Sequence, residues 1–266
     1  MTGSESAASP AAYTDTRSRR EALIAQLRER GEMDVSALPE LFGVSVETIR
    51  RDLRQLESSG RIIRSYGRVT AAESSTYETS QAFRSSHHVD EKDRIARAAA
   101  DCLGHAETVF LDEGNQPLLV GRALPADRPL TVVTTSLPTA MELAERPRYT
   151  VISVGGRVRP KTLGAVDRWA TAMLERMEPD LVFIGANGVT DDGWLTTPDP
   201  AVAAVKEMAL TVARHAILVG NHSKFGHSTF VRFGHVRSLE RIITGKELRG
   251  ATARRLEALG PLVDRV

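Results

Sequence analysis

Six short apolar runs between residues 108 and 244 are the feature that most constrains how this chain can fold. They cover residues 108–112, 130–134, 149–154, 180–185, 215–219 and 241–244. Runs that are apolar at consecutive positions are typical of strands buried on both faces, as in parallel sheets covered by helices. Segments with helical spacing separate most of them, at 90–103, 118–124, 137–143, 165–177 and 199–214. The pattern therefore predicts an α/β domain with a mostly parallel sheet.

The first 70 residues follow a different pattern, in which short helices precede a hairpin. Apolar spacing predicts helices at 19–30 and 36–42, and a third that starts at Ser45 and ends near Gly60. The side chains expected to face the core are Leu23, Ile24, Leu27, Leu38, Leu41, Phe42, Val46, Ile49, Leu53 and Leu56. Gly43 and Val44 form a tight turn before the third helix, and the alternation in 61–69 predicts a two-stranded wing. This order is typical of a winged helix-turn-helix.

The third helix carries hydroxyl and guanidinium groups on its polar face. Between residues 45 and 68, 6 Arg accompany 3 acidic residues, a net charge of 6 − 3 = +3. Ser45 can cap the helix, and Thr48 and Arg51 follow at helical spacing. We expect Ser45, Thr48 and Arg51 to reach base edges in a DNA major groove, and the phosphates to be contacted by Arg50, Arg54, Arg61, Arg64 and Arg68. The alternative is a solvated face on which Glu47 pairs with Arg50 or Arg51.

Composition excludes several other classes of protein. The 266 residues suit two domains, and the sequence has no run of 18 apolar residues that could span a membrane. The first 15 residues lack the pattern of a secretion signal, which predicts a disordered tail and a cytoplasmic location. The single cysteine, Cys102, excludes an internal disulfide. His87 and His88 are adjacent but have no Cys or carboxylate at metal-ligand spacing, so we expect neither a metal nor a cofactor.

Polar loops follow the predicted strands, at the sheet edge where ligands of α/β proteins bind. Because helix N-termini with Gly, Ser and Thr present free amides that suit an anion, these loops predict a site for a phosphorylated small molecule. Lys224, after the fifth strand, adds a positive charge. The other residues expected to bind this effector are Asp112, Gly114, Asn115, Gln116, Thr134, Thr135, Ser136, Gly155 and Gly156.

The amino-terminal part resembles the winged helix-turn-helix of DeoR-type bacterial transcription regulators. The matching residues are Val44, Ser45, Thr48, Ile49, Arg50, Arg51, Asp52, Leu53, Leu56, Glu57, Gly60 and Arg64. The family usually has His-Gly-Gly at the wing tip, where this chain has Tyr66-Gly67-Arg68. We therefore expect Arg68 to contact a phosphate or the minor groove.

The second part of the chain carries Glu91-Lys92 with Ile95-Ala96, Leu111-Asp112 with Gly114, Thr134 with Ser136, Gly155-Gly156, Gly164, Gly193, Lys206 and Ser223-Lys224-Phe225-Gly226. With these residues, 90–245 are similar to the DeoR-type sensor domain, whose fold is like those of ribose-5-phosphate isomerase and glucosamine-6-phosphate deaminase. The resemblance implies a sugar-phosphate effector and adds Lys206 to the expected site. Two departures concern that site. Glu113 brings a carboxylate into the first loop, where it would repel a phosphate unless it points away, and Asn221 replaces the usual Asp. The effector could then be a phosphosugar held differently, an unphosphorylated polyol or a nucleoside-like compound.

Together these features divide the chain into a tail (1–15), a winged helix-turn-helix (16–70), a linker (71–89), an effector-sensing αβ domain (90–250) and a second tail (251–266). They predict a transcription regulator, a repressor of a carbohydrate-metabolism operon, that binds double-stranded operator DNA as a homodimer or homotetramer and responds to a small effector. The alternative is a sugar-phosphate isomerase or deaminase with a DNA-binding appendage. No recognisable acid–base set surrounds the candidate acids, which are Asp112, Glu113, Asp191, Asp192 and Asp199.

Overall fold

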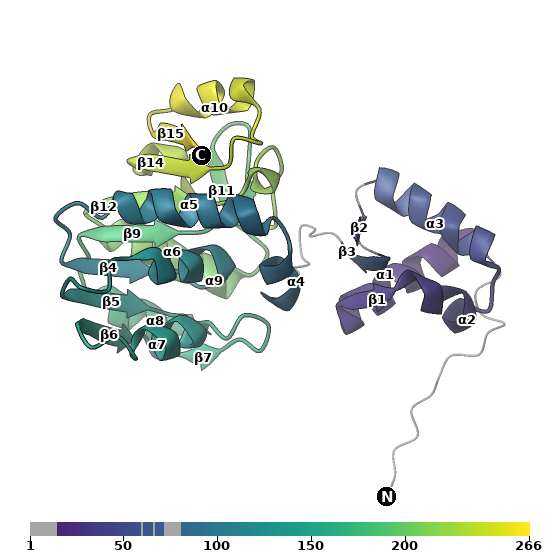
Figure 1. Cartoon of the computed structure of the whole chain (residues 1–266), viewed down its shortest axis with the longest axis horizontal. Helices are drawn as coiled ribbons and strands as arrows, with labels where there is room; N and C mark the ends of the chain where they lie inside the picture. Colours follow the sequence, from purple (N-terminus) through teal and green to yellow (C-terminus); the bar gives the residue numbers. More distant parts are fainter. Residues whose placement is uncertain (1–14, 60, 66, 72–80) are drawn as a thin grey trace, which may run out of the picture. The chain divides into compact units, whose positions relative to one another are not determined.

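The structure is a computed structural model that describes residues 15–59, 61–65, 67–71 and 81–266 (Figure 1). It divides into two compact units, Met1–Thr79 and Ser80–Val266. Gly60, Tyr66, nearly all of the predicted amino-terminal tail and the middle of the predicted linker lie outside the described residues. Among the described residues, every helix is too short or too polar to cross a bilayer.

The first unit is a helical bundle with a small antiparallel sheet. Its elements are α1 (Thr16–Arg30), β1 (Glu32–Asp34), the 3-10 turn η2 (Val35–Ala37), α2 (Leu38–Phe42), α3 (Val46–Ser58), β2 (Ile62–Ser65) and β3 (Arg68–Ala71). The predicted wing is present as β2 and β3, and β1 pairs with β3 to complete the strand order β1-β3-β2. The winged helix-turn-helix fold is thus confirmed, with a third strand that the sequence did not predict.

Two residues predicted to face this core are exposed instead. Val46 is 53% exposed and Leu41 is 38% exposed. Val46 is the first residue of α3, one turn before Ile49, where the buried stripe of that helix begins. In α2, which has five residues, Leu38 and Phe42 take the inner face and leave Leu41 on its flank. The remaining predicted core residues are buried and form one apolar cluster.

The second unit has a seven-stranded parallel sheet in the order β15-β14-β12-β9-β4-β5-β6. These strands are β4 (Thr108–Leu111), β5 (Leu130–Thr134), β6 (Tyr149–Ser153), β9 (Leu181–Ile184), β12 (His215–Val219), β14 (Arg241–Thr244) and β15 (Leu262–Arg265). Its helices are α4 (Gln81–Ser86), α5 (Val89–Asp101), α6 (Asn115–Ala123), α7 (Leu137–Leu143), α8 (Asp167–Leu174), α9 (Pro200–Val212) and α10 (Gly250–Glu257). The mostly parallel αβ fold is confirmed.

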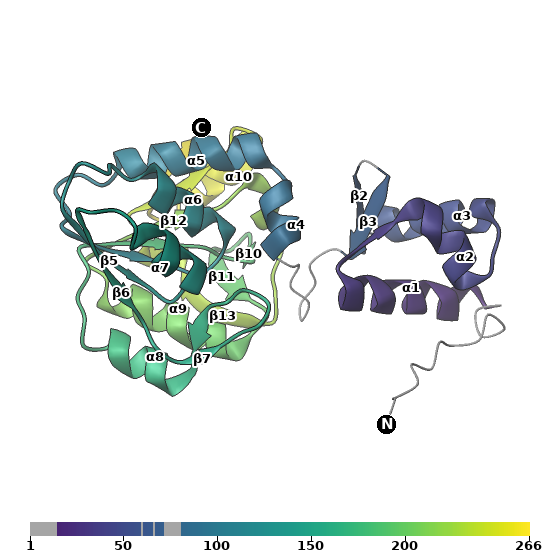
Figure 2. The same ribbon diagram turned by 60° about the horizontal axis from the view of Figure 1, so that its bottom comes forward.

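Helices cover both faces of this sheet, with α5, α6 and α7 on one face and α8 and α9 on the other (Figure 2). Alternate residues of each strand therefore enter different cores. In β9, Leu181 and Phe183 pack with α5 and α6, while Val182 and Ile184 pack with α8 and α9. This two-sided burial explains why the strands are apolar at consecutive positions.

Several parts of the second unit differ from the prediction. The segment 251–266, predicted as a tail, contributes to α10 and β15, and β15 pairs with β14 at the sheet edge. A second sheet, in the order β10-β11-β13, is formed by β10 (Gly188–Val189), β11 (Trp194–Thr197) and β13 (Val231–His235). A short hairpin pairs β7 (Arg157–Val158) with β8 (Ala165–Val166), and 3-10 turns occupy η3 (His222–Lys224) and η4 (Val236–Ser238). Helix α6 begins at Asn115, three residues before the predicted start.

Phe183→Ala should destabilise the second unit by about 3–5 kcal/mol, because Phe183 is fully buried in the central strand β9. The exposed Phe230 provides the control, since Phe230→Ala should change the free energy of unfolding by less than about 0.5 kcal/mol. Both tryptophans, Trp169 and Trp194, belong to this unit, so urea unfolding followed by tryptophan fluorescence reports on it alone. Equal urea midpoints of unfolding for Phe183→Ala and Phe230→Ala would contradict the burial of Phe183 in the core.

Candidate DNA-contacting helix and strand-end site

Helix α3 is positioned by a tight turn and an amino-terminal cap. Gly43 ends α2 with a φ of 62°, in the left-handed region that favours glycine. Ser45 then caps α3, because its hydroxyl accepts a hydrogen bond from the Thr48 backbone N–H at 3.2 Å. The Ser45 and Thr48 hydroxyls also lie 2.9 Å apart. The predicted cap is confirmed, and it places both hydroxyls on the exposed first turn of the helix.

A buried carboxylate joins α3 to α1. Asp52 lies among the apolar residues of α3 and is almost fully buried. Its two oxygens accept from Arg19 Nε at 2.6 Å and Arg20 Nε at 2.7 Å. Two cations thus compensate the charge, as burial of a carboxylate requires. Sequence reasoning missed this clamp, although Asp52 occupies a helical position between Ile49 and Leu56 where an apolar residue is expected.

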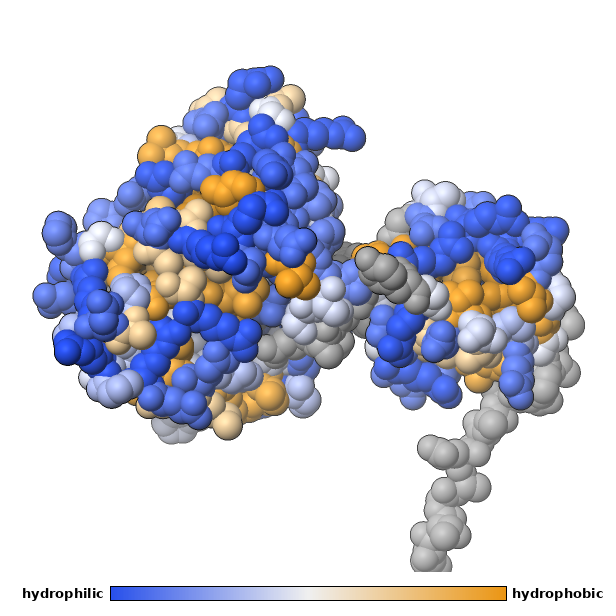
Figure 3. Space-filling view, viewed as in Figure 1, coloured by the Kyte–Doolittle hydropathy of each residue, from blue (hydrophilic) through white to orange (hydrophobic). Residues whose placement is uncertain are grey.

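Three of the arginines expected to contact DNA already have acidic partners in the same unit. Arg54 Nη2 lies 3.0 Å from Glu47, Arg68 Nε lies 3.4 Å from Glu32, and Arg64 pairs with Glu57. The alternative pairing of Glu47 with Arg50 or Arg51 is wrong, because its partner Arg54 lies two turns along α3. Arg50, Arg51 and Arg61 are exposed. The surface over α3 is strongly hydrophilic (Figure 3).

At the carboxyl ends of the sheet strands, Asp112 links three elements of the second unit. It follows β4, and its Oδ2 accepts from the backbone N–H of Gly185, after β9, at 2.9 Å. Lys206 of α9 pairs with the same carboxylate and also donates to the Gly185 carbonyl at 3.0 Å. Both charged side chains are buried. Lys206 therefore ties two strand ends and α9 together.

Glu113 belongs to a buried polar network. Its carboxylate accepts from Arg159 Nη1 at 3.0 Å and from the Thr162 hydroxyl at 2.7 Å. Burial raises the pKa of Glu113, against the opposing effect of Lys206 and Arg159. Gly164 lies directly against this carboxylate, where a Cβ would collide with it. Arg159 thus compensates the charge of the Glu113 carboxylate within the protein.

The other residues around this edge fall into two groups. Thr134 and Ser136 shape the loop, since Thr134 Oγ1 accepts from the Ser136 N–H at 3.0 Å and Ser136 caps α7. Asn115, Gln116 and Thr135 each bury a side-chain oxygen without a protein hydrogen-bond partner among the described residues. Buried polar atoms are normally paired, so these three oxygens retain hydrogen-bonding capacity that the described residues do not use. Gly114, with a φ of 113°, precedes the first turn of α6.

Gly155, Gly156 and Lys224 lie in different surroundings. The two glycines follow β6 and line an open hollow of about 640 Å³ together with Trp169, Met173 and Met177 of the α8 region. A Cβ at Gly156 would collide with the Val166 carbonyl, which accounts for this glycine structurally. Lys224 is half-buried in η3, after β12. The structure thus brings most, but not all, of the predicted effector residues to one cluster.

Comparison with known proteins identifies both units. A DeoR-like helix-turn-helix domain matches residues 19–75, and the DeoR C terminal sensor domain matches residues 87–246. The chain belongs to the DeoR family. The HTH-type transcriptional regulator GlpR of Haloferax volcanii is 31% identical over 245 residues, which are 92% of this chain and 96% of that relative. This family membership makes the chain a DNA-binding transcription regulator, as the sequence predicted.

Two further relatives of the family come from Escherichia coli. The glycerol-3-phosphate regulon repressor is 30% identical over 226 residues, covering 85% of this chain and 89% of the repressor. The L-fucose operon activator is 31% identical over 228 residues, covering 85% of this chain and 93% of the activator. Because the alignments cover most of each relative, both relatives contain the same two units in the same order.

Asp52→Ala should destabilise the DeoR-like helix-turn-helix domain by about 3–5 kcal/mol, because it leaves Arg19 and Arg20 without their buried partner. Glu47→Ala removes an exposed ion pair from the same helix and should cost at most about 1 kcal/mol. Hydrogen exchange by mass spectrometry measures both effects through peptides of α1 and α3. Unchanged protection of these peptides in Asp52→Ala would show that the ion pairs of Asp52 with Arg19 and Arg20 do not hold α1 and α3 together.

Proposed function

We propose that this regulator represses a carbohydrate-metabolism operon and that a small polyhydroxy effector, such as a phosphorylated sugar, modulates its binding to the operator. The observation that carries the DNA half of this proposal is the solvent-accessible amino-terminal half of α3, which carries Ser45, Thr48 and Arg51 at three-residue spacing. The name of the glycerol-3-phosphate regulon repressor supports repression, in contrast to that of the L-fucose operon activator, and it supports a phosphorylated effector. A regulator of operons acts on the chromosome, so we place it in the cytoplasm.

We assign the effector site to the strand-end cluster around Asn115, Gln116 and Thr135. Their oxygens without protein partners match the hydroxyl groups of a polyol, and the amino end of α6 favours an attached phosphate. The nearby charges support sensing over catalysis, because Lys206 pairs with Asp112 and Arg159 pairs with Glu113. Neither carboxylate is placed as an uncommitted general base.

We further propose that the regulator binds its operator as a homo-oligomer. Two copies present two copies of α3 to two half-sites, whose spacing follows from the symmetry of the protein. The surface of α8 supports such contacts, because Trp169 is 80% exposed beside the hollow lined by Met173 and Met177. Large exposed apolar side chains of this kind are typical of protein interfaces.

Thr48→Ala should weaken binding to the preferred operator by about 1–3 kcal/mol and relax sequence choice at one base pair, because Thr48 is assigned to a base edge. The operator can be obtained by selecting tight-binding duplexes with the wild-type chain, and affinities measured by fluorescence anisotropy. Ser58→Ala is the matched control, because Ser58 lies at the opposite end of α3 and its loss should not affect the preference for DNA sequence. Equal losses of affinity for selected and random duplexes in Thr48→Ala would refute the assignment.

Thr135→Val should weaken effector binding roughly 10-fold, the value of about one hydrogen bond, while leaving the unliganded stability nearly unchanged. The measurement is the shift in melting temperature of the full chain with glycerol 3-phosphate, ribose 5-phosphate, glucosamine 6-phosphate and their unphosphorylated counterparts. Thr131→Val, at the other end of β5, is the control. A ligand that stabilises wild type and Thr135→Val alike would place the effector elsewhere.

A further inference from the structure

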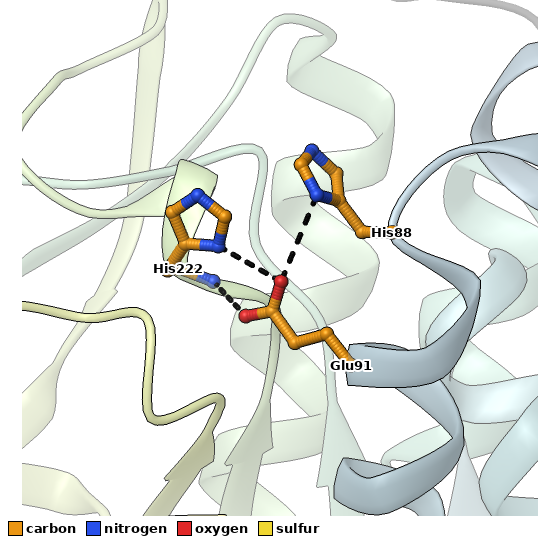
Figure 4. Close-up of side chains that lie close together, drawn as sticks. All are labelled: His88, Glu91 and His222. Carbon is orange, nitrogen blue, oxygen red and sulfur yellow. Dashed lines mark hydrogen bonds and ion pairs between the residues drawn. The ribbon is translucent and has the colours of Figure 1, made fainter.

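Two histidines and a glutamate converge on one point of the second unit. His88 and Glu91 lie at the start of α5, and His222 begins η3, 131 residues further along the chain than Glu91. His222 Nδ1 is 2.8 Å from Glu91 Oε2, and His88 Nδ1 is 3.7 Å from the same oxygen. One ligand atom from each of the three residues lies within 4.8 Å of the others. Figure 4 shows both imidazole rings turned towards this oxygen.

The carboxylate of this cluster is held rigidly. Glu91 is only 4% exposed, and its second oxygen accepts from the His222 backbone N–H at 2.7 Å. Gly245 leaves room for it, because a Cβ there would collide with the carboxylates of Glu91 and Glu247. A buried carboxylate favours a cation beside it. The neighbouring Glu247 has its own cation, because Arg94 Nη2 lies 2.7 Å from it.

The two imidazoles are oriented for the same partner and remain open to solvent. Their ring centroids are 5.0 Å apart with an interplanar angle of 87°, and the side chains of His88 and His222 are 42% and 33% exposed. His88 takes a φ of 55°, a conformation that non-glycine residues rarely adopt and that recurs at functional sites. Burial and then the neighbouring His222 lower the pKa of His88, against the opposing effect of Glu91.

We propose that His88, Glu91 and His222 form a binding site for a divalent transition metal of the Zn²⁺ type. Zinc takes His nitrogen and carboxylate oxygen at about 2.0–2.2 Å, which sets neighbouring ligand atoms about 3.4 Å apart in a tetrahedron. The observed separations of 2.8 and 3.7 Å lie on either side of this value. Both histidines bind through Nδ1, with Nε2 protonated, and water completes the open side. Three protein ligands and an open position distinguish such a site from a closed structural one.

The site joins two segments that sequence alone does not connect. We expected no metal because His87 and His88 have no Cys or carboxylate at metal-ligand spacing in the sequence. In the structure, Glu91 lies one helical turn after His88, and the fold brings His222 next to both. The bound ion would fix the start of α5 to the loop after β12, which also carries Lys224. This role is separate from the proposed effector site, which uses other residues.

Isothermal titration of the full chain with ZnCl₂, after removal of metal with a chelator, tests this site. We expect the wild type to bind about one equivalent, and Co²⁺ in its place to give the visible absorption of a four- or five-coordinate ion. His88→Ala and His222→Ala should each weaken binding by at least about 100-fold, because loss of an outer-shell partner alone costs about 10–100-fold. His105→Ala, an exposed histidine outside the cluster, should bind as wild type does.

Glu91→Gln provides a variant that keeps the side-chain shape and a hydrogen-bond acceptor for the His222 backbone. It should retain the wild-type circular dichroism spectrum and lose the Co²⁺ absorption. Absence of binding to the wild type would overturn the proposal. So would one equivalent of Zn²⁺ that persists at unchanged affinity in His88→Ala and Glu91→Gln. Because neither readout uses an effector or DNA, the outcome is independent of the proposed regulatory function.

Discussion

The buried pair between Asp112 and Lys206 is the interaction on which the strand-end site depends. It joins the loop after β4, the backbone after β9 and helix α9 at one point. Because both charges are buried, removal of either partner would leave the other without compensation. The pair therefore fixes the loop that leads from β4 to α6, the helix that carries Asn115 and Gln116.

The first unit uses the same principle on a smaller scale. Asp52 lies inside the apolar stripe of α3 and holds two arginines of α1. An apolar residue of similar size could fill that position, but it would not select the particular guanidinium groups that fix the orientation of α3. In both units, a buried carboxylate thus sets the geometry of a region that carries candidate functional side chains.

Sequence analysis predicted the helices and strands that have a strong hydrophobic pattern. It missed the strands that are defined mainly by their pairing with other strands. Six of the seven parallel strands follow from their apolar runs, because burial on both faces leaves a continuous signal. Strand β15 was not predicted, because only two of its four residues, Leu262 and Val263, are apolar. Strand β10, with two residues, is too short for a period to emerge, and β11 is half polar, with the sequence Trp-Leu-Thr-Thr.

The candidate sites show the same division. Ser45 was predicted as a cap because its role depends on residues nearby in the sequence, and the structure confirms it. The roles of Asp52 and Glu113 depend on partners 33 and 46 residues away, Arg19 and Arg159, so spacing carried no signal for them. Lys206 was named from family resemblance, and the structure supplies its partner, Asp112.

The ion pairs of Arg54, Arg64 and Arg68 have a consequence for how affinity varies with ionic strength. A guanidinium group that leaves Glu47, Glu57 or Glu32 for a phosphate exchanges one anionic partner for another. Each phosphate contact still releases counterions from the duplex. However, each carboxylate that loses its arginine partner takes up a cation from solution, which offsets part of that release. The logarithm of the association constant should then fall less steeply with salt than the number of arginine contacts alone implies.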